Sequence, residues 1–402
     1  MVMPRTGRHC ASPALDLHAG AAEYGRQLHR HADHVMQPEL NIYVCSTVRH
    51  LLFALLRSDL HKEETHHILF FADYQHASLA DWHLDSLPVK VIVREMNRGS
   101  VRQHMDSSVR GRLCYYFAMR NWPAPEALLA PLRALLADSA PQLSIALKAA
   151  RPGQRQPQLW LFNERNRMAR LLRLLIPQFS LIEDGESNYR LQLCAWWKWP
   201  ERLLRGLPLR SRVLGEEASC EAVYALTPER LPERIRDKGR RIDFLEHGSA
   251  RALMNRIFSG LAAIPRHAGQ VILATQPFRI PGVSLADKQR VYDRIISHLK
   301  TQGVPVVLKN HPAEDAGDYA FLGDRVHRMP GKVPLEAMLP GNTEPLTVVS
   351  VFSTAGMGFE RYCRRIRLCA ESESDALYLQ TVRSWIAEPR KLDEVLKEKL
   401  PA

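Results

Sequence analysis

The sequence predicts an α/β protein built from two Rossmann-like domains that face each other across a cleft. The chain has 402 residues, and at roughly 100 to 200 residues per domain this length favours two domains. Short apolar runs alternate with helical runs in two separate parts of the chain, which is typical of parallel sheets covered by helices. A less regular segment, about residues 194–255, separates the two parts. In such sheets, ligands bind beyond the carboxyl ends of the strands.

The first part is expected to contribute five strands and two helices. Each expected strand is a short run of apolar and β-branched residues, and the runs are 41–45, 67–72, 89–93, 158–162 and 179–182. The run from Val48 to Leu56 has a helical composition, and Ser46 or Thr47 can cap it. A second helix is expected after Asn163, with four arginines on its exposed turns: Arg165, Arg167, Arg170 and Arg173.

The second part repeats this alternation. Strands are expected at 270–274, 304–309 and 347–352, and a helix is expected at about 284–300. We therefore place an N-terminal domain at 39–255 and a C-terminal domain at 256–402, whose last helix is expected to pack back on the N-terminal domain. Residues 1–38 mix Pro, Gly, Ala and His without a period, so we expect a weakly ordered N-terminal extension.

Lysine and arginine outnumber aspartate and glutamate by 55 to 43, which gives a net charge of +12. This surplus favours an anionic partner, which could be a nucleic acid, an acidic membrane surface or a negatively charged substrate. No stretch reaches the ~18 consecutive apolar residues of a membrane-spanning helix, and the first 50 residues have no signal-peptide core, so we expect a cytoplasmic protein. The seven cysteines are scattered and form no CxxC pair, which favours reduced thiols over disulfides or a zinc site.

Glu183, Asp184 and Gly185 directly follow the strand expected at 179–182. The glycine permits a sharp turn close to a substrate. A carboxylate at this place could deprotonate a hydroxyl group as a general base. An acidic surface turn is the alternative, because Asp-Gly is a common turn pair.

Two further polar segments follow expected strands, namely His311-Pro312 after 304–309 and Ser353-Thr354 after 347–352. Proline restricts the residue before it to extended geometry, so His311 is held in place and could donate to a phosphate as a general acid. The two hydroxyl groups are expected at the start of a helix, where they could bind a phosphate together with backbone N–H groups. The alternatives are an ordinary loop histidine and simple helix capping.

In this order, Glu183-Asp184-Gly185, His311-Pro312 and Ser353-Thr354 resemble the D/E-D/E-G, HP and Ser-Ser/Thr motifs of bacterial sialyltransferases. Within that family, the pattern resembles lipooligosaccharide sialyltransferases and capsule polysialyltransferases.

Other segments agree with this resemblance, which covers about residues 41–356. Residues 41–47 and the leucine-rich run after them look like the family's first strand and helix. Thr275-Gln276-Pro277 resembles the family's TQP strand end, and Pro334-Leu335-Glu336 resembles its P-x-E segment. The charged pair Arg49-His50 departs from the pattern.

The resemblance implies a GT-B fold and an inverting, metal-independent transfer of sialic acid. The donor would be CMP-sialic acid, and the acceptor a hydroxyl group of a bacterial surface glycan such as lipooligosaccharide, capsule or O-antigen. Asp184, or else Glu183, would be the base that activates the acceptor, and His311 would be the general acid. The implied CMP contacts are Gln276, Pro277, His311, Pro312, Glu336, Ser353 and Thr354. Ser46, Thr47 and Gly185 would lie at the acceptor or form turns. No cofactor and no metal ligand is implied.

The sequence leaves two alternatives open, one for the donor sugar and one for the class of protein. The motifs indicate CMP more strongly than the sugar, so the donor could instead carry Kdo, legionaminic acid or pseudaminic acid. The basic surface could also belong to a nucleic-acid-binding protein, although the arginine-rich stretches lack an RNP-type or zinc-finger pattern.

Three tryptophans stand among basic residues: Trp196, Trp197 and Trp199, with Lys198, Arg202, Arg205, Arg210 and Arg212. This pattern favours peripheral contact with an anionic membrane. Such contact would hold the protein on the inner face of the bacterial inner membrane, near a lipid-linked acceptor. Packing of the tryptophans between the domains is the alternative. The arginines after Asn163 could bind an acidic acceptor or form a solvated helix face.

Overall fold

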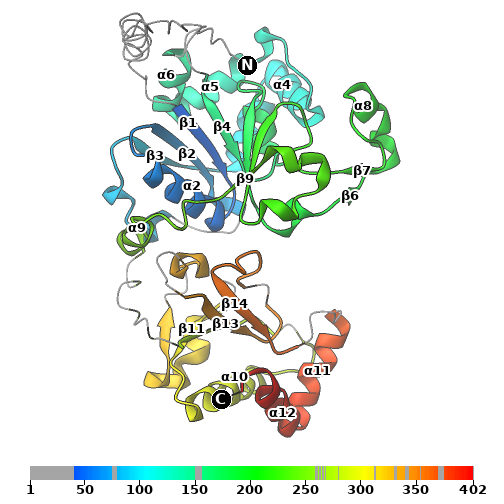
Figure 1. Cartoon of the computed structure of the whole chain (residues 1–402). Coiled ribbons are helices and arrows are strands. Elements are labelled where there is room, and N and C mark those ends of the chain that lie inside the picture. Colours follow the sequence, from blue (N-terminus) through cyan, green and yellow to red (C-terminus); the bar gives the residue numbers. More distant parts are fainter. Residues whose placement is uncertain are drawn as a thin grey trace, which may run out of the picture. The chain divides into compact units, whose positions relative to one another are not determined.

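A computed structural model describes residues 40–74, 79–149, 156–258, 261, 264, 267, 269–278, 280–311, 314–329, 333–339, 344–353, 355–369 and 375–401 (Figure 1). The expected extension at 1–38 lies outside these residues. Residues 40–402 belong to one compact unit, and within it the described strands form two large parallel sheets.

The first sheet has seven parallel strands in the order β3-β2-β1-β4-β5-β8-β9 among the described residues. Its strands are β1 (Leu40–Cys45), β2 (Thr65–Phe71), β3 (Val91–Met96), β4 (Gln158–Leu161), β5 (Phe179–Ile182), β8 (Cys220–Ala225) and β9 (Gly239–Arg241). The strand order reverses at β1, which lies between β2 and β4. A doubly wound sheet binds its ligands beside such a reversal, at the carboxyl ends of the strands.

Helices cover both faces of this sheet. They are α2 (Val48–Leu60), α3 (Arg98–Asp106), α4 (Val109–Arg120), α5 (Ala130–Ser139), α6 (Pro141–Ala149), α7 (Arg167–Leu172) and α9 (Ala250–Ile257). Helix α8 (Trp199–Leu204) lies to one side of the sheet and contributes no side chain to the apolar clusters described on its two faces. Side chains of β1 alternate between two apolar clusters: Tyr43 packs in the cluster that contains the leucines of α2, and Ile42 packs in the cluster of α4 and α5. Burial on both faces explains why this strand is mostly apolar. A short antiparallel pair, β6 (Gln192–Leu193) and β7 (Ser211–Arg212), stands apart from the sheet.

The second sheet has the order β12-β11-β10-β13-β14, again with parallel pairs. Its elements are β10 (Val271–Ala274), α10 (Leu285–Thr301), β11 (Val306–Lys309), β12 (His327–Met329), β13 (Leu346–Ser350), β14 (Cys363–Arg367), α11 (Asp375–Ala387) and α12 (Pro389–Lys399). Helix α12 packs Leu392 and Leu396 into the apolar cluster of this second sheet, and its Asp393 pairs with Arg294 of α10 at 2.5 Å. We expected the last helix to pack back on the N-terminal domain, but these contacts hold it on the second sheet.

The predicted α/β class with two Rossmann-like sheets is confirmed, and each predicted strand is present within about three residues of its predicted limits. The prediction that 194–255 is irregular is wrong, because this segment contributes β8 and β9 to the first sheet. The sequence analysis also missed β12 and β14. Three of these four strands, β9, β12 and β14, are edge strands. Edge strands tolerate charged residues, so Gly-Arg-Arg in β9 and Cys-Arg-Arg-Ile-Arg in β14 show no apolar run.

Candidate functional site

Glu183 is the first residue after β5, and its side chain is fully buried. Its Oε1 accepts a hydrogen bond from Nη2 of Arg49 at 3.2 Å. Its Oε2 accepts hydrogen bonds from the hydroxyl of Tyr189 and from the backbone N–H of Leu226 at 2.8 Å. Burial raises the pKa of Glu183, and the charge of Arg49 opposes this effect. Both carboxylate oxygens are thus engaged inside the protein, which makes Glu183 an anchor between β5, α2 and the end of β8.

Asp184 is the next residue, and 27% of its side chain is exposed. Its Oδ1 lies 2.5 Å from Nε2 of His50, and its backbone N–H donates to Oδ1 of Asn188 at 3.0 Å. Burial alone would raise the pKa of Asp184, but the hydrogen bond from His50 and the charge of Arg49 hold that pKa below its usual value. Asp184 is therefore an ionised carboxylate with access to solvent.

His50 of α2 holds Asp184 in place. Its Nδ1 accepts a hydrogen bond from the backbone N–H of Ser46 at 3.2 Å, so Nε2 carries the proton and donates to Asp184. The ring stacks on Phe162 with centroids 4.2 Å apart. Burial lowers the pKa of His50, against the influence of Asp184. Arg49 and His50 are the pair that departs from the family pattern, and each contacts one of the two acids.

Replacing His50 by phenylalanine is expected to lower kcat about tenfold, because the ring can still stack on Phe162 but no longer fixes Asp184. The hydrogen bond lowers the pKa of Asp184, so its loss should also move the acid limb of the pH–rate profile to higher pH. His50→Gln offers an amide N–H in place of Nε2 and should restore part of the rate. An acid limb that stays in place in His50→Phe would contradict this positioning role.

Three further candidate residues, Ser46, Thr47 and Gly185, lie close to these acids in the sequence or through their contacts. Thr47 caps α2, since its Oγ1 accepts the backbone N–H of His50 at 3.2 Å. Ser46 is buried, and its Oγ accepts from the side-chain amide of Asn166 at 2.6 Å. Gly185 has φ 142°, a conformation that favours glycine. The cap is therefore Thr47 of the two candidates.

The segment that follows β4 and contains α7 differs from its prediction. The helix begins at Arg167 and is capped by Asn166 rather than Asn163. Arg170 donates to the carbonyl of Met119 at 2.7 Å. Arg173 is largely buried and pairs with Glu217 at 2.5 Å. The prediction of four arginines on exposed turns is wrong, because Arg165, Arg170 and Arg173 are at least half-buried and bonded, which leaves Arg167 as the exposed one.

The carboxyl end of β10 organises the corresponding edge of the second sheet. The Thr275 hydroxyl donates to Glu314 and accepts the backbone N–H of His311 at 3.2 Å. The Gln276 side chain donates to the hydroxyl of Tyr378 at 2.9 Å and accepts the backbone N–H of Phe352 at 2.9 Å. The two residues that directly follow the central strand thus hold the segments that carry His311 and Ser353.

Glu314 stabilises the His311 segment through its buried carboxylate. Its Oε2 accepts the His311 backbone N–H at 3.0 Å, and its Oε1 lies 2.9 Å from Nζ of Lys288 and accepts the hydroxyl of Tyr319 at 2.8 Å. The Glu314 side chain is almost fully buried. The backbone of His311 is therefore fixed by a paired carboxylate, a role that the sequence analysis had given to Pro312, which lies outside the described residues.

Lys309, at the end of β11, is a buried lysine beside this segment. Its Nζ donates to the carbonyl of Asn310 at 2.7 Å. Burial lowers the pKa of Lys309 to about 8, and the charges of Glu336 and Glu314 oppose this effect. Glu336 is half-buried in a short 3₁₀ helix, Leu335–Met338. Lys309, Glu314 and Glu336 thus bring charges of the HP and P-x-E segments within range of one another at the edge of the second sheet. Pro277, which follows Gln276, is half-buried.

Ser353 follows β13, and its Oγ accepts the backbone N–H of Ala355 at 3.1 Å. Thr354 lies outside the described residues. The prediction that a helix starts here is wrong, because residues 355–358 form turns that lead to β14. Gly356 and Gly358 both have positive φ, and consecutive helical residues cannot form around them. A phosphate at this place would meet hydroxyl groups and turn backbone rather than a helix end.

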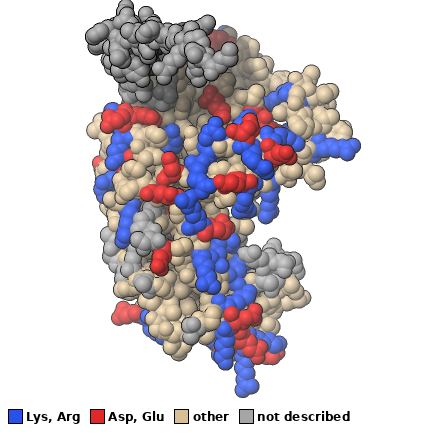
Figure 2. All heavy atoms as spheres, in the orientation of Figure 1, with Lys and Arg blue, Asp and Glu red and all other residues tan. Residues whose placement is uncertain are grey.

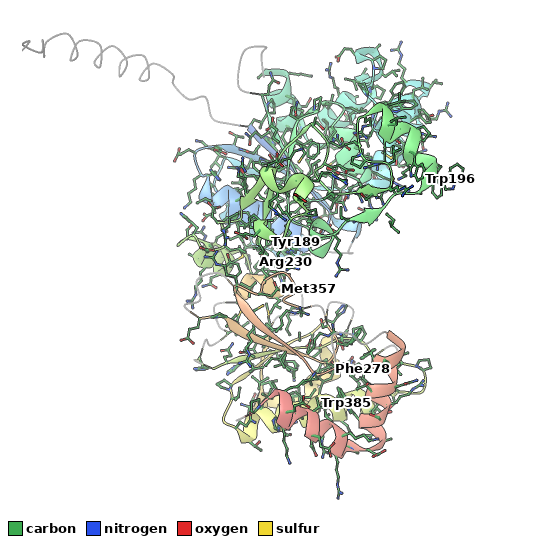
Figure 3. The ribbon with its side chains drawn as sticks, turned by 45° about the vertical axis from the view of Figure 1, so that its right-hand side comes forward. Tyr189, Trp196, Arg230, Phe278, Met357 and Trp385 are labelled. Atoms are coloured by element: carbon green, nitrogen blue, oxygen red, sulfur yellow. The ribbon has the colours of Figure 1, made fainter. Side chains whose placement is uncertain are left out.

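The turns after β13 approach Glu183 and its partner Arg49. The ring of Phe359 lies 4.5 Å from the guanidinium carbon of Arg49 and packs against Phe53. A Cβ atom on Gly358 would lie 3.2 Å from Oε1 of Glu183. Figure 3 labels Tyr189, Arg230 and Met357. Tyr189 binds Glu183, and the guanidinium carbon of Arg230 lies 4.8 Å from the Tyr189 ring centroid. Met357 belongs to the turns after β13. The segments of the first and third motifs therefore touch.

The tryptophan segment is exposed. Trp196 is 72% exposed and Trp197 is 65% exposed, and Trp196 is labelled in Figure 3 at the edge of the molecule. The same stretch of the chain exposes four leucines: Leu191, Leu193, Leu203 and Leu204. Trp199 is half-buried, and Arg202 is buried, where it donates to the carbonyls of Pro208 and Ser211. Packing of Trp196 and Trp197 in a core is thus excluded.

Charged side chains of both signs are interspersed on the face shown in Figure 2. In the described part of the chain, no three His, Cys, Asp or Glu side chains gather as a metal-binding group. None of the described helices is both long enough and apolar enough to cross a bilayer.

No protein-family model matches the chain, and no curated protein matches it. Solved structures with a similar fold include an α/β-galactoside α-2,3-sialyltransferase from Photobacterium phosphoreum, with a TM-score of 0.49 and 10% identity over 89% of this chain and 97% of that one. A sialyltransferase from Photobacterium damsela has a TM-score of 0.48 and 12% identity over 90% of this chain and 79% of that one. UDP-GlcNAc 2-epimerase from Neisseria meningitidis has a TM-score of 0.39 and 13% identity over 88% and 93%.

Proposed function

We propose that the protein is an inverting glycosyltransferase that moves sialic acid from CMP-sialic acid to a hydroxyl group of a bacterial surface glycan. One observation carries the proposal: Asp184, an ionised and accessible carboxylate, lies next to Glu183, which contacts the turns that follow Ser353. A base and a segment with hydroxyl groups for a leaving phosphate are what this transfer requires. The motif order of the sequence supports the same assignment.

In the proposed reaction, Asp184 accepts the proton of the acceptor hydroxyl group while that oxygen attacks the anomeric carbon of the donor. The bond from this carbon to the CMP phosphate breaks, and its electron pair stays on the phosphate oxygen. The His311 side chain donates a proton to the leaving phosphate, and the Ser353 and Thr354 hydroxyl groups donate hydrogen bonds to it. Glu336 accepts hydrogen bonds from the ribose. The new bond forms on the face opposite the leaving group, and the residues supply both proton transfers, so the proposal includes no metal.

A panel of CMP-sugars tests the proposal and its nearest alternative. Wild-type protein is incubated with CMP-sialic acid, CMP-Kdo, CMP-legionaminic acid or CMP-pseudaminic acid and a galactoside acceptor, with and without EDTA, and released CMP is measured. We expect acceptor-dependent release with CMP-sialic acid, unchanged by EDTA. Release with only another CMP-sugar would replace the donor and keep the mechanism. Release with none of them would overturn the proposal.

We further propose that the exposed Trp196 and Trp197, with the exposed leucines of the same stretch, dock on an anionic membrane that carries the acceptor. The rings are amphipathic, and the exposed Arg210 lies in the same segment, which suits an anionic lipid interface. The double variant Trp196→Ser/Trp197→Ser should sediment several-fold less with vesicles that contain phosphatidylserine. Trp122→Ser, which changes an exposed tryptophan elsewhere, is the control. Failure of the wild type to bind these vesicles would contradict the proposal.

A further inference from the structure

The first sheet has a pocket at its carboxyl edge that the proposed mechanism does not use. The pocket has a volume of about 520 Å³, and three arginines line it together with Asp73 and Tyr115. Arg98 and Arg102 belong to α3, which follows β3, and Arg167 is the first residue of α7, which follows β4. Asp73 comes just after β2. We call this site the arginine pocket.

Two of the arginines are oriented by carboxylates. Nε of Arg98 lies 2.9 Å from Oδ2 of Asp73, and Nε of Arg102 donates to Oδ2 of Asp106 at 2.6 Å. The guanidinium of Arg102 lies over the ring of Tyr115 at 4.0 Å. These contacts fix the directions of both side chains, and both remain more than one-third exposed.

Arg167 differs from the other two. Its side chain is exposed, and the structure shows no hydrogen bond or ion pair between this side chain and the described residues. Counting Asp73 and Asp106 against the three arginines, the pocket keeps one positive charge, and Arg167 is the group that carries it. A guanidinium in this position suits a planar or tetrahedral oxyanion, which it can bind through two parallel N–H groups.

The pocket is connected to Asp184 through hydrogen bonds. Asn166, which precedes Arg167, donates to Oγ of Ser46 at 2.6 Å. The backbone N–H of Ser46 donates to His50, which binds Asp184. Strands β4 and β5 are neighbours, so Arg167 and Asp184 follow strands that are roughly 5 Å apart. Strand β3 is four strand spacings from β5, roughly 20 Å, so the pocket extends away from the base.

From these observations we propose that the arginine pocket binds an acidic group, a carboxylate or a phosphate, on the acceptor. The inference rests on the proposed function and defines the class of its acceptor: an anionic glycan longer than one sugar. The acid would lie over Arg98, Arg102 and Arg167, while the hydroxyl group to be modified lies at Asp184. The anion-binding side chains are then separate from those that bind CMP.

The test compares three acceptors that share one reacting galactoside: a neutral form, a form with a carboxylate on a neighbouring sugar, and a form with a phosphate there. Arg167→Gln should raise KM for the acidic acceptor about tenfold, the loss expected for one charge-assisted hydrogen bond. It should leave kcat, and KM for the neutral acceptor, unchanged. Arg112→Gln, which changes an exposed arginine of α4 that does not line the pocket, should change none of these values. Whichever acidic form gives the larger effect identifies the anion.

Equilibrium binding separates this inference from the proposed function. The carboxylate and phosphate forms of the acceptor are titrated calorimetrically into the wild type and into Arg167→Gln, without donor. Weaker binding to the variant, with no CMP released from any donor, would keep the pocket and overturn the transferase. CMP release with equal KM values for neutral and acidic acceptors, or equal changes for both in Arg167→Gln, would overturn the pocket.

Discussion

Asp184→Asn is expected to lower kcat about 10²- to 10⁴-fold, the range for loss of a general base. The amide is isosteric with the carboxylate, and its Oδ1 can still accept the hydrogen bond from His50, so the fold and KM for the donor should change little. The measurement is acceptor-dependent CMP release at saturating donor. The acid limb of the wild-type rate should lie at a lower pH than that at which an ordinary aspartate is protonated, because the pKa of Asp184 is held below its usual value and the base is lost only when the carboxylate is protonated.

Asp85→Asn is the matched control, since it changes an exposed aspartate of the same domain that lies far along the chain from the site. Its activity should equal that of the wild type. If Asp184→Asn keeps more than a tenth of the wild-type kcat, Asp184 is not the base, and the assignment passes to another group.

Glu183→Ala is expected to lower the free energy of unfolding by about 3 to 5 kcal/mol, the range for breaking a buried ion pair by removing one partner. The alanine would leave Arg49 without its carboxylate and the N–H of Leu226 and the hydroxyl of Tyr189 without their acceptor. Urea unfolding at neutral pH measures the loss. Glu183→Gln keeps one acceptor oxygen and should lose less.

The same variants distinguish the two adjacent acids. At a temperature where Glu183→Gln is folded, its kcat should stay within about tenfold of the wild type, because Asp184 is intact. A double variant, Arg49→Leu/Glu183→Leu, should be less destabilised than the sum of its single changes, since it leaves no unpaired charge. A loss below about 1 kcal/mol in Glu183→Ala would show that the buried contacts of this side chain do not stabilise the fold.

Much of the fold could be predicted from the sequence because the central strands are buried on both faces. Runs such as 41–45 and 306–309 contain few polar residues, and each is followed by residues that end a strand. An edge strand need not carry this signal, and the arginine-rich β14 was missed because it lacks an apolar run. The same reason hid β9, whose three residues include two exposed arginines.

The candidate site could be predicted only in part, because its partners are distant in sequence. Asp184 was identified from its place after a strand, but nothing local indicates that His50 donates to it across 134 residues. Likewise, nothing near Glu314 in the sequence distinguishes it from an ordinary loop acid, because its contacts with Lys288 and Tyr319 form only in the folded protein. Arg173 was misjudged for the same reason, since its carboxylate partner, Glu217, lies 44 residues away.

The alternation of Glu183 and Asp184 makes activity a reporter of strand register. The backbone N–H of Glu183 donates to the carbonyl of Tyr224 at 2.9 Å and thus continues the ladder between β5 and β8. Glu183 is buried against Arg49, Tyr189 and Leu226, whereas Asp184 is partly exposed and bound to His50. A slip of one residue would exchange the two acids and bury the base. During refolding, recovered turnover would therefore count only chains whose β5 has paired in register, even where circular dichroism already shows a complete complement of secondary structure.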